Sequence, residues 1–271
     1  MRFSLNQYIC PQNYPVDKFI NIASNVGAKA VGLSSETLKS IEARHLKLKL
    51  KKSNVKGSSL NRVGYFIYKN KAQQQNQFKK NIEIIQFASE IEAKTVCVIT
   101  GGISNSNLSI ENARNEILIQ LNKLCNKANQ YGVTLGLEPI HPVDLYSKGC
   151  INTLRSAVKL IDEISNLRIV LDLFHSWWDP DLLHFIDKYI DKISLIQFCN
   201  TLHSYQNLKP IRNTPLEGPI NVLMILNRIH KKGYDNYYEF ELFNQDLQGK
   251  DFESVIKIAS NDFSMIKEKI I

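Results

Sequence analysis

The stretch RIVLDLFHSWWDPDLL, residues 168–183, begins like a buried strand and changes character at Asp172. Its first half holds an apolar run, Ile169–Leu171, of the kind found in parallel strands that are covered on both faces. After Asp172 come His175 and the pair Trp177–Trp178, which are the only tryptophans of the chain. A carboxylate at the end of a buried strand needs partners that offset its charge. The stretch therefore predicts a strand whose last residues face a site.

Short apolar runs of this kind recur eight times along the chain, and amphipathic stretches with helical spacing separate them. The expected strands are Phe3–Tyr8, Ala28–Leu33, Gly57–Leu60, Thr95–Ile99, Thr134–Glu138, Ile169–Asp172, Ile193–Phe198 and Tyr237–Leu242. Eight strands that alternate with about eight helices predict an α/β fold, a (β/α)8 TIM barrel. We expect one domain, residues 1–271. A doubly wound open sheet is the structural alternative, but no glycine-rich fingerprint follows the first strand.

Two segments carry signals for helix boundaries. Asp179-Pro180 predicts a helix start, because Asp is favoured at the N-cap and Pro at the first helical position. Leu223, Leu226 and Ile229 keep helical spacing before Lys231-Lys232-Gly233, which has the basic last turn and the glycine typical of a helix end.

The composition is that of a soluble globular protein, with 44% hydrophobic and 22% charged residues. The formal net charge of +8 would suit nucleic acid or an anionic substrate. The basic residues form only one dense run, Lys47–Lys52, and a solvated helix face explains that run better. We therefore do not expect a nucleic-acid partner.

The cysteines and the N-terminal residues bear on the compartment. Five Cys without CxxC spacing argue against a disulfide framework or a zinc ribbon. The first ten residues, MRFSLNQYIC, lack the apolar run of a signal peptide. No apolar segment reaches the roughly 20 residues that a membrane-spanning helix needs. We expect a cytoplasmic protein without membrane association.

Acidic residues collect at the ends of the expected strands. Glu138 ends the fifth strand, Asp172 the sixth, and Glu239 and Glu241 belong to the eighth. In a barrel, chemistry gathers at these strand ends. Carboxylates that converge there would repel and neutralise each other unless a cation joins them. A divalent metal surrounded by oxygen ligands resolves the conflict, so we expect a metal site.

Three further segments carry a family resemblance. They are GVTLGLEPIHP (residues 132–142), VLDLFHSWWDP (residues 170–180), and RNTPLEGPI (residues 212–220) with the FELF that follows it at residues 240–243. Together they resemble the xylose isomerase-like TIM barrels, the sugar phosphate isomerase/epimerase superfamily that includes inosose dehydratases and isomerases. The resemblance runs from SLNQY in the first strand to FELF, nearly the whole chain.

The resemblance implies a ligand set and two catalytic residues. A divalent metal would be held by Glu138, Asp172, Gln197 and Glu241. Glu138 and Glu241 would also act as base and acid. Glu241 is preferred to Glu239 because the family's acid sits within the FELF-like motif.

The seventh strand departs from the family pattern. The family usually has His followed three residues later by Asp, and this chain has Gln197 and Asn200. An amide oxygen is a harder ligand than an imidazole, so Mn²⁺ or Mg²⁺ is favoured, with Zn²⁺ or Co²⁺ as alternatives. The loss of Asp removes a charge that could orient the metal ligands.

Other residues are candidates for substrate contacts. The resemblance implies that His175 and Arg212 bind substrate oxygens. His141, Asn6, Trp177 and Trp178 are further candidates, the tryptophans as an apolar wall for a sugar ring. The alternative role of these residues is to hold loops or to pack. Arg62 is a weaker candidate, and Tyr8 and Tyr65 are expected to pack.

These residues predict a metal-dependent isomerase or epimerase of carbohydrate metabolism. It would move a proton next to the carbonyl of a keto-sugar, a sugar phosphate or a keto-polyol through a metal-stabilised enediolate. Three alternatives stay open: a dehydratase of an inosose-like ketone, a non-catalytic sugar-binding relative, and, least favoured, an apurinic-site DNA endonuclease. A homodimer or homotetramer would be typical of such barrels.

Overall fold

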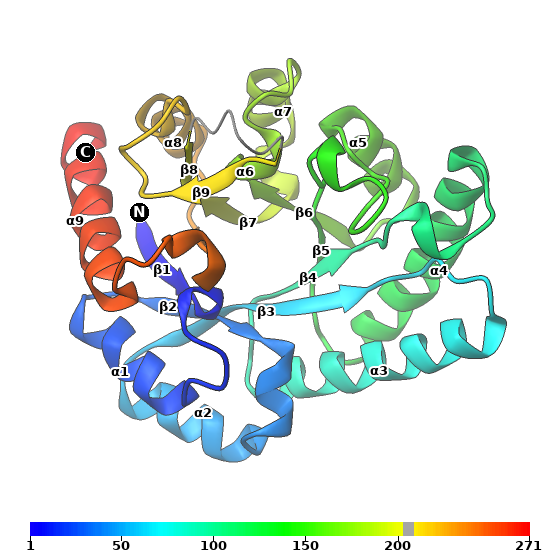
Figure 1. Ribbon diagram of the computed structural model, residues 1–271, viewed down its shortest axis with the longest axis horizontal. Helices are drawn as coiled ribbons and strands as arrows, with labels where there is room; N and C mark the ends of the chain where they lie inside the picture. Colours follow the sequence, from blue (N-terminus) through cyan, green and yellow to red (C-terminus); the bar gives the residue numbers. More distant parts are fainter. Residues whose placement is uncertain (203–208) are drawn as a thin grey trace.

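Eight parallel strands close into a barrel in the computed structural model, which describes residues 1–202 and 209–271 (Figure 1). Around the barrel they follow the order β1-β10-β7-β6-β5-β4-β3-β2. Their bounds are β1 (Arg2–Asn6), β2 (Ala30–Ser34), β3 (Lys56–Gly64), β4 (Thr95–Ile99), β5 (Leu135–Leu137), β6 (Leu167–Asp172), β7 (Ile193–Phe198) and β10 (Tyr237–Phe240). The predicted TIM-barrel fold is confirmed, and each expected strand overlaps one of these eight.

Helices surround the barrel on all sides (Figure 1). They are α1 (Val16–Asn25), α2 (Ala43–Lys52), α3 (Lys71–Glu90), α4 (Ile110–Gln130), α5 (Leu154–Glu163), α6 (Leu173–Ser176), α7 (Leu182–Tyr189), α8 (Val222–Lys231) and α9 (Phe252–Ile270). Side-chain caps start many of them, such as Asn70 for α3 and Ser109 for α4. Their apolar faces pack on the outside of the strands and form one large core. None of the helices described is long and apolar enough to cross a membrane.

The barrel interior changes from apolar to acidic along the strands. Near the start of the strands it holds a small apolar cluster: Ala30, Cys97, Val170, Leu195 and Tyr237. Side chains alternate along a strand, so Tyr237, Glu239 and Glu241 point to the same side. Glu239 occupies the middle of the barrel, and Glu241 lies at its C-terminal mouth. The apolar cluster therefore fills the barrel below the acidic residues.

A two-stranded sheet at the mouth was not predicted. It consists of β8 (Asn200–Leu202) and β9 (Ile211–Asn213), which pair antiparallel with Thr201 opposite Arg212. Strands of three residues are too short for a periodic signal in the sequence. This sheet fixes the backbone of Arg212 above the barrel.

The helix predicted at Asp179 begins later, so that prediction was wrong. Helix α7 starts at Leu182, and Asp179 does not cap it. The Asp179 carboxylate instead accepts hydrogen bonds from the backbone N–H of Leu154, at 2.8 Å, and of Asp181, at 2.9 Å. Leu154 is the first residue of α5, so the carboxylate ties the loop after β6 to the neighbouring helix.

Candidate active site

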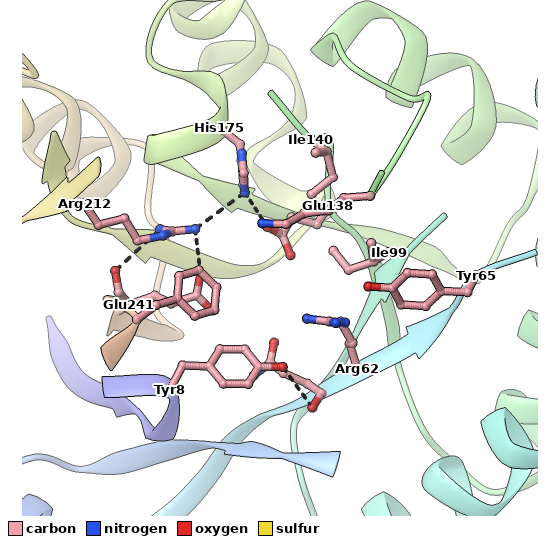
Figure 2. Close-up of a pocket in the computed structure, with 12 residues that line it drawn as sticks. Tyr8, Arg62, Tyr65, Ile99, Glu138, Ile140, His175, Arg212 and Glu241 are labelled. Carbon is pink, nitrogen blue, oxygen red and sulfur yellow. Dashed lines mark hydrogen bonds and ion pairs between the residues drawn. The ribbon is translucent and has the colours of Figure 1, made fainter. Parts of the chain in front are cut away.

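Three buried carboxyl groups meet at the mouth of the barrel, and two of them, Glu138 and Glu241, are labelled in Figure 2. Glu138 follows β5, Asp172 ends β6 and Glu241 follows β10. In the barrel, β6 and β7 separate β5 from β10, so the acids approach the centre from different sides. The strand ends thus bring together acids that lie far apart in the sequence.

Arg212 is the cation that balances two of these acids. Its Nη2 atom lies 2.7 Å from Asp172 Oδ2 and 2.9 Å from Glu241 Oε2. The guanidinium is fully buried and packs over the ring of Phe174, with Cζ 4.2 Å from the ring centre, and over the ring of Phe243 at 5.0 Å. Arg212 therefore orients both carboxylates and has little freedom of its own.

His175 is a neutral hydrogen-bond donor in this arrangement. Its Nδ1 accepts the backbone N–H of His141 at 3.1 Å, so the ring proton resides on Nε2. Burial, with Arg212 nearby, lowers the pKa of His175 well below its ordinary value. Its Nε2 lies 3.5 Å from Glu138 Oε1 and 3.8 Å from Asp172 Oδ2. The imidazole can thus donate to Glu138 or to an oxygen bound in the site.

Glu138 and Glu241 hold protons more strongly than ordinary glutamates. Burial raises the pKa of Glu138 well above its usual range, and the charges of Glu241 and Asp172 raise it further. Burial also raises the pKa of Glu241 to about 8, although Arg212 opposes the shift. A carboxyl group whose pKa is raised toward neutral pH, as in Glu241, is suited to general acid–base catalysis.

Glu239 lies deeper in the barrel and is saturated by neutral donors. Its carboxylate accepts hydrogen bonds from Asn6 at 2.8 Å, Ser58 at 2.6 Å, Ser59 at 2.9 Å and Gln197 at 3.1 Å. Ser58 is the extra residue of a β-bulge in β3, which lets two adjacent serines face the same carboxylate. This buried acid is satisfied by the protein alone.

Gln197 and Asn200 occupy the two positions that depart from the family pattern. The Nε2 group of Gln197 donates to Glu241 at 2.9 Å as well as to Glu239, and its buried Oε1 has no partner among the described residues. Asn200 donates to the carbonyls of Pro215 and Ile220, each at 3.0 Å. Asn200 therefore holds the loop after β9, whereas Gln197 faces the carboxylates.

Part of the predicted ligand set, Glu138 and Asp172, belongs to a group of side chains that could hold a metal ion. Glu138, Asp172 and His175 each place a ligand atom within 4.8 Å of the others. His175 is a poor ligand, however, because Nδ1 is occupied and Nε2 carries a proton. The free Oε1 of Gln197 and the carboxylates supply the hard oxygen donors that such a cation prefers.

A cavity that opens to solvent lies above the acids. It is lined by Tyr8, Asn61, Arg62, Tyr65, Ile99, Glu138, Ile140, Lys148, His175, Arg212, Glu241 and Phe243. Five residues that the sequence suggested are in this lining: Glu138, His175, Arg212, Glu241 and the weaker candidate Arg62. Sequence reasoning missed Lys148, which lies in a loop without a recognisable motif, and Phe243, which ends the FELF motif but was not named as a site residue. It expected Tyr8 and Tyr65 only to pack.

The other predicted substrate contacts lie outside the lining. Trp178 Nε1 donates to the carbonyl of His175 at 2.8 Å, and the His141 ring packs edge-on against Trp178. Trp177 is 37% exposed. Asn6 is buried and donates to Glu241 as well as to Glu239. In this arrangement Asn6, Trp178 and His141 support the residues that face the cavity.

Comparisons with known proteins agree with this architecture. A model of the xylose isomerase-like TIM barrel family matches residues 20–268. A protein of Sinorhizobium meliloti 1021 is similar in structure, with a TM-score of 0.91 and 22% identity over 97% of this chain and 98% of that one. A search of curated protein sequences finds no match.

Two further solved structures share the fold. The IolI protein with a bound zinc atom has a TM-score of 0.85 and 18% identity, over 100% of this chain and 99% of that one. An L-ribulose 3-epimerase has a TM-score of 0.81 and 16% identity, over 99% of this chain and 95% of that one. At such identities the likeness establishes the fold, and function must be argued from the site.

Proposed function

The chain belongs to the xylose isomerase-like TIM barrel family, and we propose that it is an isomerase or epimerase that transfers a proton next to the carbonyl of a keto-sugar or keto-polyol. Solved structures of this fold include epimerases and a dehydratase. They support an enzyme that acts on a small polyhydroxy ketone.

One observation carries the proposal: two buried carboxyl groups, Glu138 and Glu241, line the same cavity from different strand ends. Removal of a proton next to a carbonyl needs a base that is partly free near neutral pH. Return of the proton at the neighbouring carbon, or on the other face, needs an acid in a different direction. Glu138, which follows β5, and Glu241, which follows β10, can serve as this base and this acid. Positioned proton transfer contributes about 10²–10⁴-fold in rate.

A divalent cation, with Mn²⁺ or Mg²⁺ favoured, would be held by Glu138, Asp172, Gln197 and Glu241. When bound, it supplies Lewis-acid stabilisation of negative charge on substrate oxygens. The electrostatics of the site support a cation there. The raised pKa values of Glu138 and Glu241 reflect negative charge that the protein alone does not offset, and a divalent cation would offset it.

The neighbouring residues would orient the substrate and the acids. The Nε2 proton of His175 points toward Glu138 and would donate to a substrate hydroxyl. Arg212 holds Asp172 and Glu241 in one orientation, so that neither acid must reorganise during proton transfer. Loss of a β-hydroxyl in place of the second protonation would give dehydration on the same site.

Proton exchange with solvent tests the proposal. Purified protein loaded with Mn²⁺ is incubated in D₂O with a panel of ketoses, ketose phosphates and inososes, and NMR follows deuterium at the carbon next to the carbonyl. We expect exchange with at least one class of substrate, and a loss of about 10²–10⁴-fold in Glu138→Gln and in Glu241→Gln. Arg155→Gln, a surface change on α5, serves as the control.

Metal analysis of the same samples separates the two parts of the proposal. We expect about one metal ion per chain in the wild type and less in Glu241→Gln. Ligand binding without any exchange would instead support a non-catalytic sugar-binding protein.

A further inference from the structure

Three cations line the cavity, and they differ in how the protein uses them. Arg212 forms ion pairs with Asp172 and Glu241. Lys148 lies 3.5 Å from a carboxylate oxygen of Asp144. Arg62 makes no ion pair within 4.0 Å with any carboxylate in the described part of the chain.

The Arg62 side chain is placed to meet a ligand. It comes from β3, and Figure 2 shows its guanidinium pointing into the cavity beside the ring of Tyr65. Its Cζ lies 5.3 Å from the centre of that ring. Arg62 and Tyr65 are half-buried, so the protein has removed part of their water shell. A partly desolvated guanidinium that lacks a counter-charge gains more than an exposed one from an anion that binds it.

The groups around Arg62 favour an anion as well. Burial raises the pKa of Tyr65, which keeps its phenol neutral and able to donate, while the Tyr8 hydroxyl donates to the carbonyl of Asn61 at 3.3 Å. Lys148, in the loop before α5, and Lys209, which precedes β9, both pair with the carboxylate of Asp144, at 3.5 and 3.2 Å. The cavity lining therefore holds two cations, Arg62 and Lys148, besides the paired Arg212.

We propose that Arg62 is a specificity-determining residue that binds an oxyanion of the substrate, a carboxylate or a phosphate. This inference rests on the proposed function and names its substrate class: a keto-sugar acid or a keto-sugar phosphate in place of a neutral ketose. The planar fork of N–H donors in a guanidinium matches both oxyanions. The carbonyl end of the substrate would then lie over Glu138 and Glu241.

A neutral polyol would bring no charge to pair with the guanidinium of Arg62. Hydroxyl groups are bound well by neutral donors, and the inner barrel provides such donors for Glu239. Arg62 is also not required as a partner for Glu138, because the two groups form no ion pair within 4.0 Å. The guanidinium is best explained by a charge that the ligand brings.

Binding calorimetry on the purified full chain tests the assignment without turnover. The probes are D-fructose 6-phosphate, 2-keto-D-gluconate and D-fructose, which present a phosphate, a carboxylate and no charge. We expect at least one anionic probe to bind about tenfold or more tighter than D-fructose, and Arg62→Gln to weaken that probe by about 10- to 100-fold. The affinity for D-fructose should stay the same.

Two further variants separate charge from structure. Arg155→Gln removes the same charge from an exposed position on α5 and should change no affinity. Arg62→Lys keeps the charge but not the fork, so it should retain part of the preference for the anion. The anionic probe that loses more affinity in Arg62→Gln identifies the oxyanion as phosphate or carboxylate.

Three results would overturn the assignment: equal affinity for all three probes, no binding of either anionic probe at millimolar concentration, or an equal loss for D-fructose in Arg62→Gln. The proposed function fails separately. If anions bind through Arg62 but no ketone exchanges its proton with D₂O, the oxyanion site stands and the isomerase proposal does not. If neutral ketoses exchange without any preference for anions, the reverse holds.

Discussion

Two layers of the barrel interior treat a buried glutamate in opposite ways. In the inner layer, Glu239 is closed off from solvent and accepts hydrogen bonds from four neutral side chains: Asn6, Ser58, Ser59 and Gln197. In the outer layer, Glu138 lines the cavity, and its Oε1 lies 3.5 Å from His175 Nε2. Both acids are almost fully buried, so burial alone does not distinguish them.

The two carboxylates differ in their hydrogen-bond partners. Neutral donors supplied by several strands make Glu239 a structural anchor that ties β1, β3, β7 and β10 together. Glu138 is left with its hydrogen-bonding capacity largely unused, and such a group is free to take a cation, a proton or a substrate hydroxyl. The candidate chemistry therefore sits where the protein leaves its own polar groups incomplete.

The largest effect should come from one isosteric change made in each layer. Glu138→Gln should lower proton exchange into a bound ketone by about 10²–10⁴-fold, since Gln cannot carry the proton. Its thermal midpoint should stay the same or rise, because a costly buried acid is removed. Glu239→Gln should keep exchange within about tenfold of wild type. Equal losses in both variants, measured by NMR in D₂O, would erase the functional distinction.

Removal of the inner carboxylate should act on stability. Glu239→Leu leaves several buried donors without an acceptor, at a cost of about 1–3 kcal/mol for each donor that stays unpaired. We expect the free energy of unfolding to fall by about 3 kcal/mol or more, as measured by urea denaturation. Glu253→Leu, on helix α9, is the control for loss of an acid without an inner-layer role. A loss of stability no larger than that of the control would contradict the anchor role.

Gly32 makes room for the inner carboxylate. A Cβ atom at this position would lie 2.5 Å from either oxygen of Glu239. Gly32→Ala should therefore destabilise the protein by about 1–3 kcal/mol through overpacking. Gly57→Ala is a matched control on the next strand, where the new atom would meet Ala93 at 3.3 Å. Equal unfolding midpoints for the two variants would show that Glu239 moves aside at little cost.

Gln197 contacts acids of both layers, so its substitution should have a smaller effect, on both stability and Mn²⁺ binding. Gln197→Met removes its donors to Glu239 and Glu241 and its free Oε1. We expect about 1 kcal/mol lower stability and about tenfold weaker Mn²⁺ binding, measured by denaturation and calorimetry. Gln86→Met, on the surface of α3, should change neither. Unaltered Mn²⁺ affinity in Gln197→Met would place Gln197 in the inner layer alone.

The strand ends were predictable because their signals are local. A parallel strand covered on both faces needs a continuous apolar run, and the run stops where the chain reaches the mouth of the barrel. Glu138, Asp172 and Glu241 could thus be assigned to one end of the barrel before any contact was known. The helix expected at Asp179 failed because the same carboxylate served a different helix, and sequence spacing does not reveal a partner such as Leu154.

The alternation of apolar runs and polar strand ends, read from the sequence alone, determined the barrel fold and the place where its acids gather. Only the tertiary structure decided what each acid meets. The N–H of His141 sets the tautomer of His175, and the short β8–β9 sheet brings Arg212 to Asp172. Arg62 forms no ion pair within 4.0 Å with a carboxylate of the described residues. Such contacts join residues far apart in the chain, and their energies depend on distances and burial that no local pattern encodes.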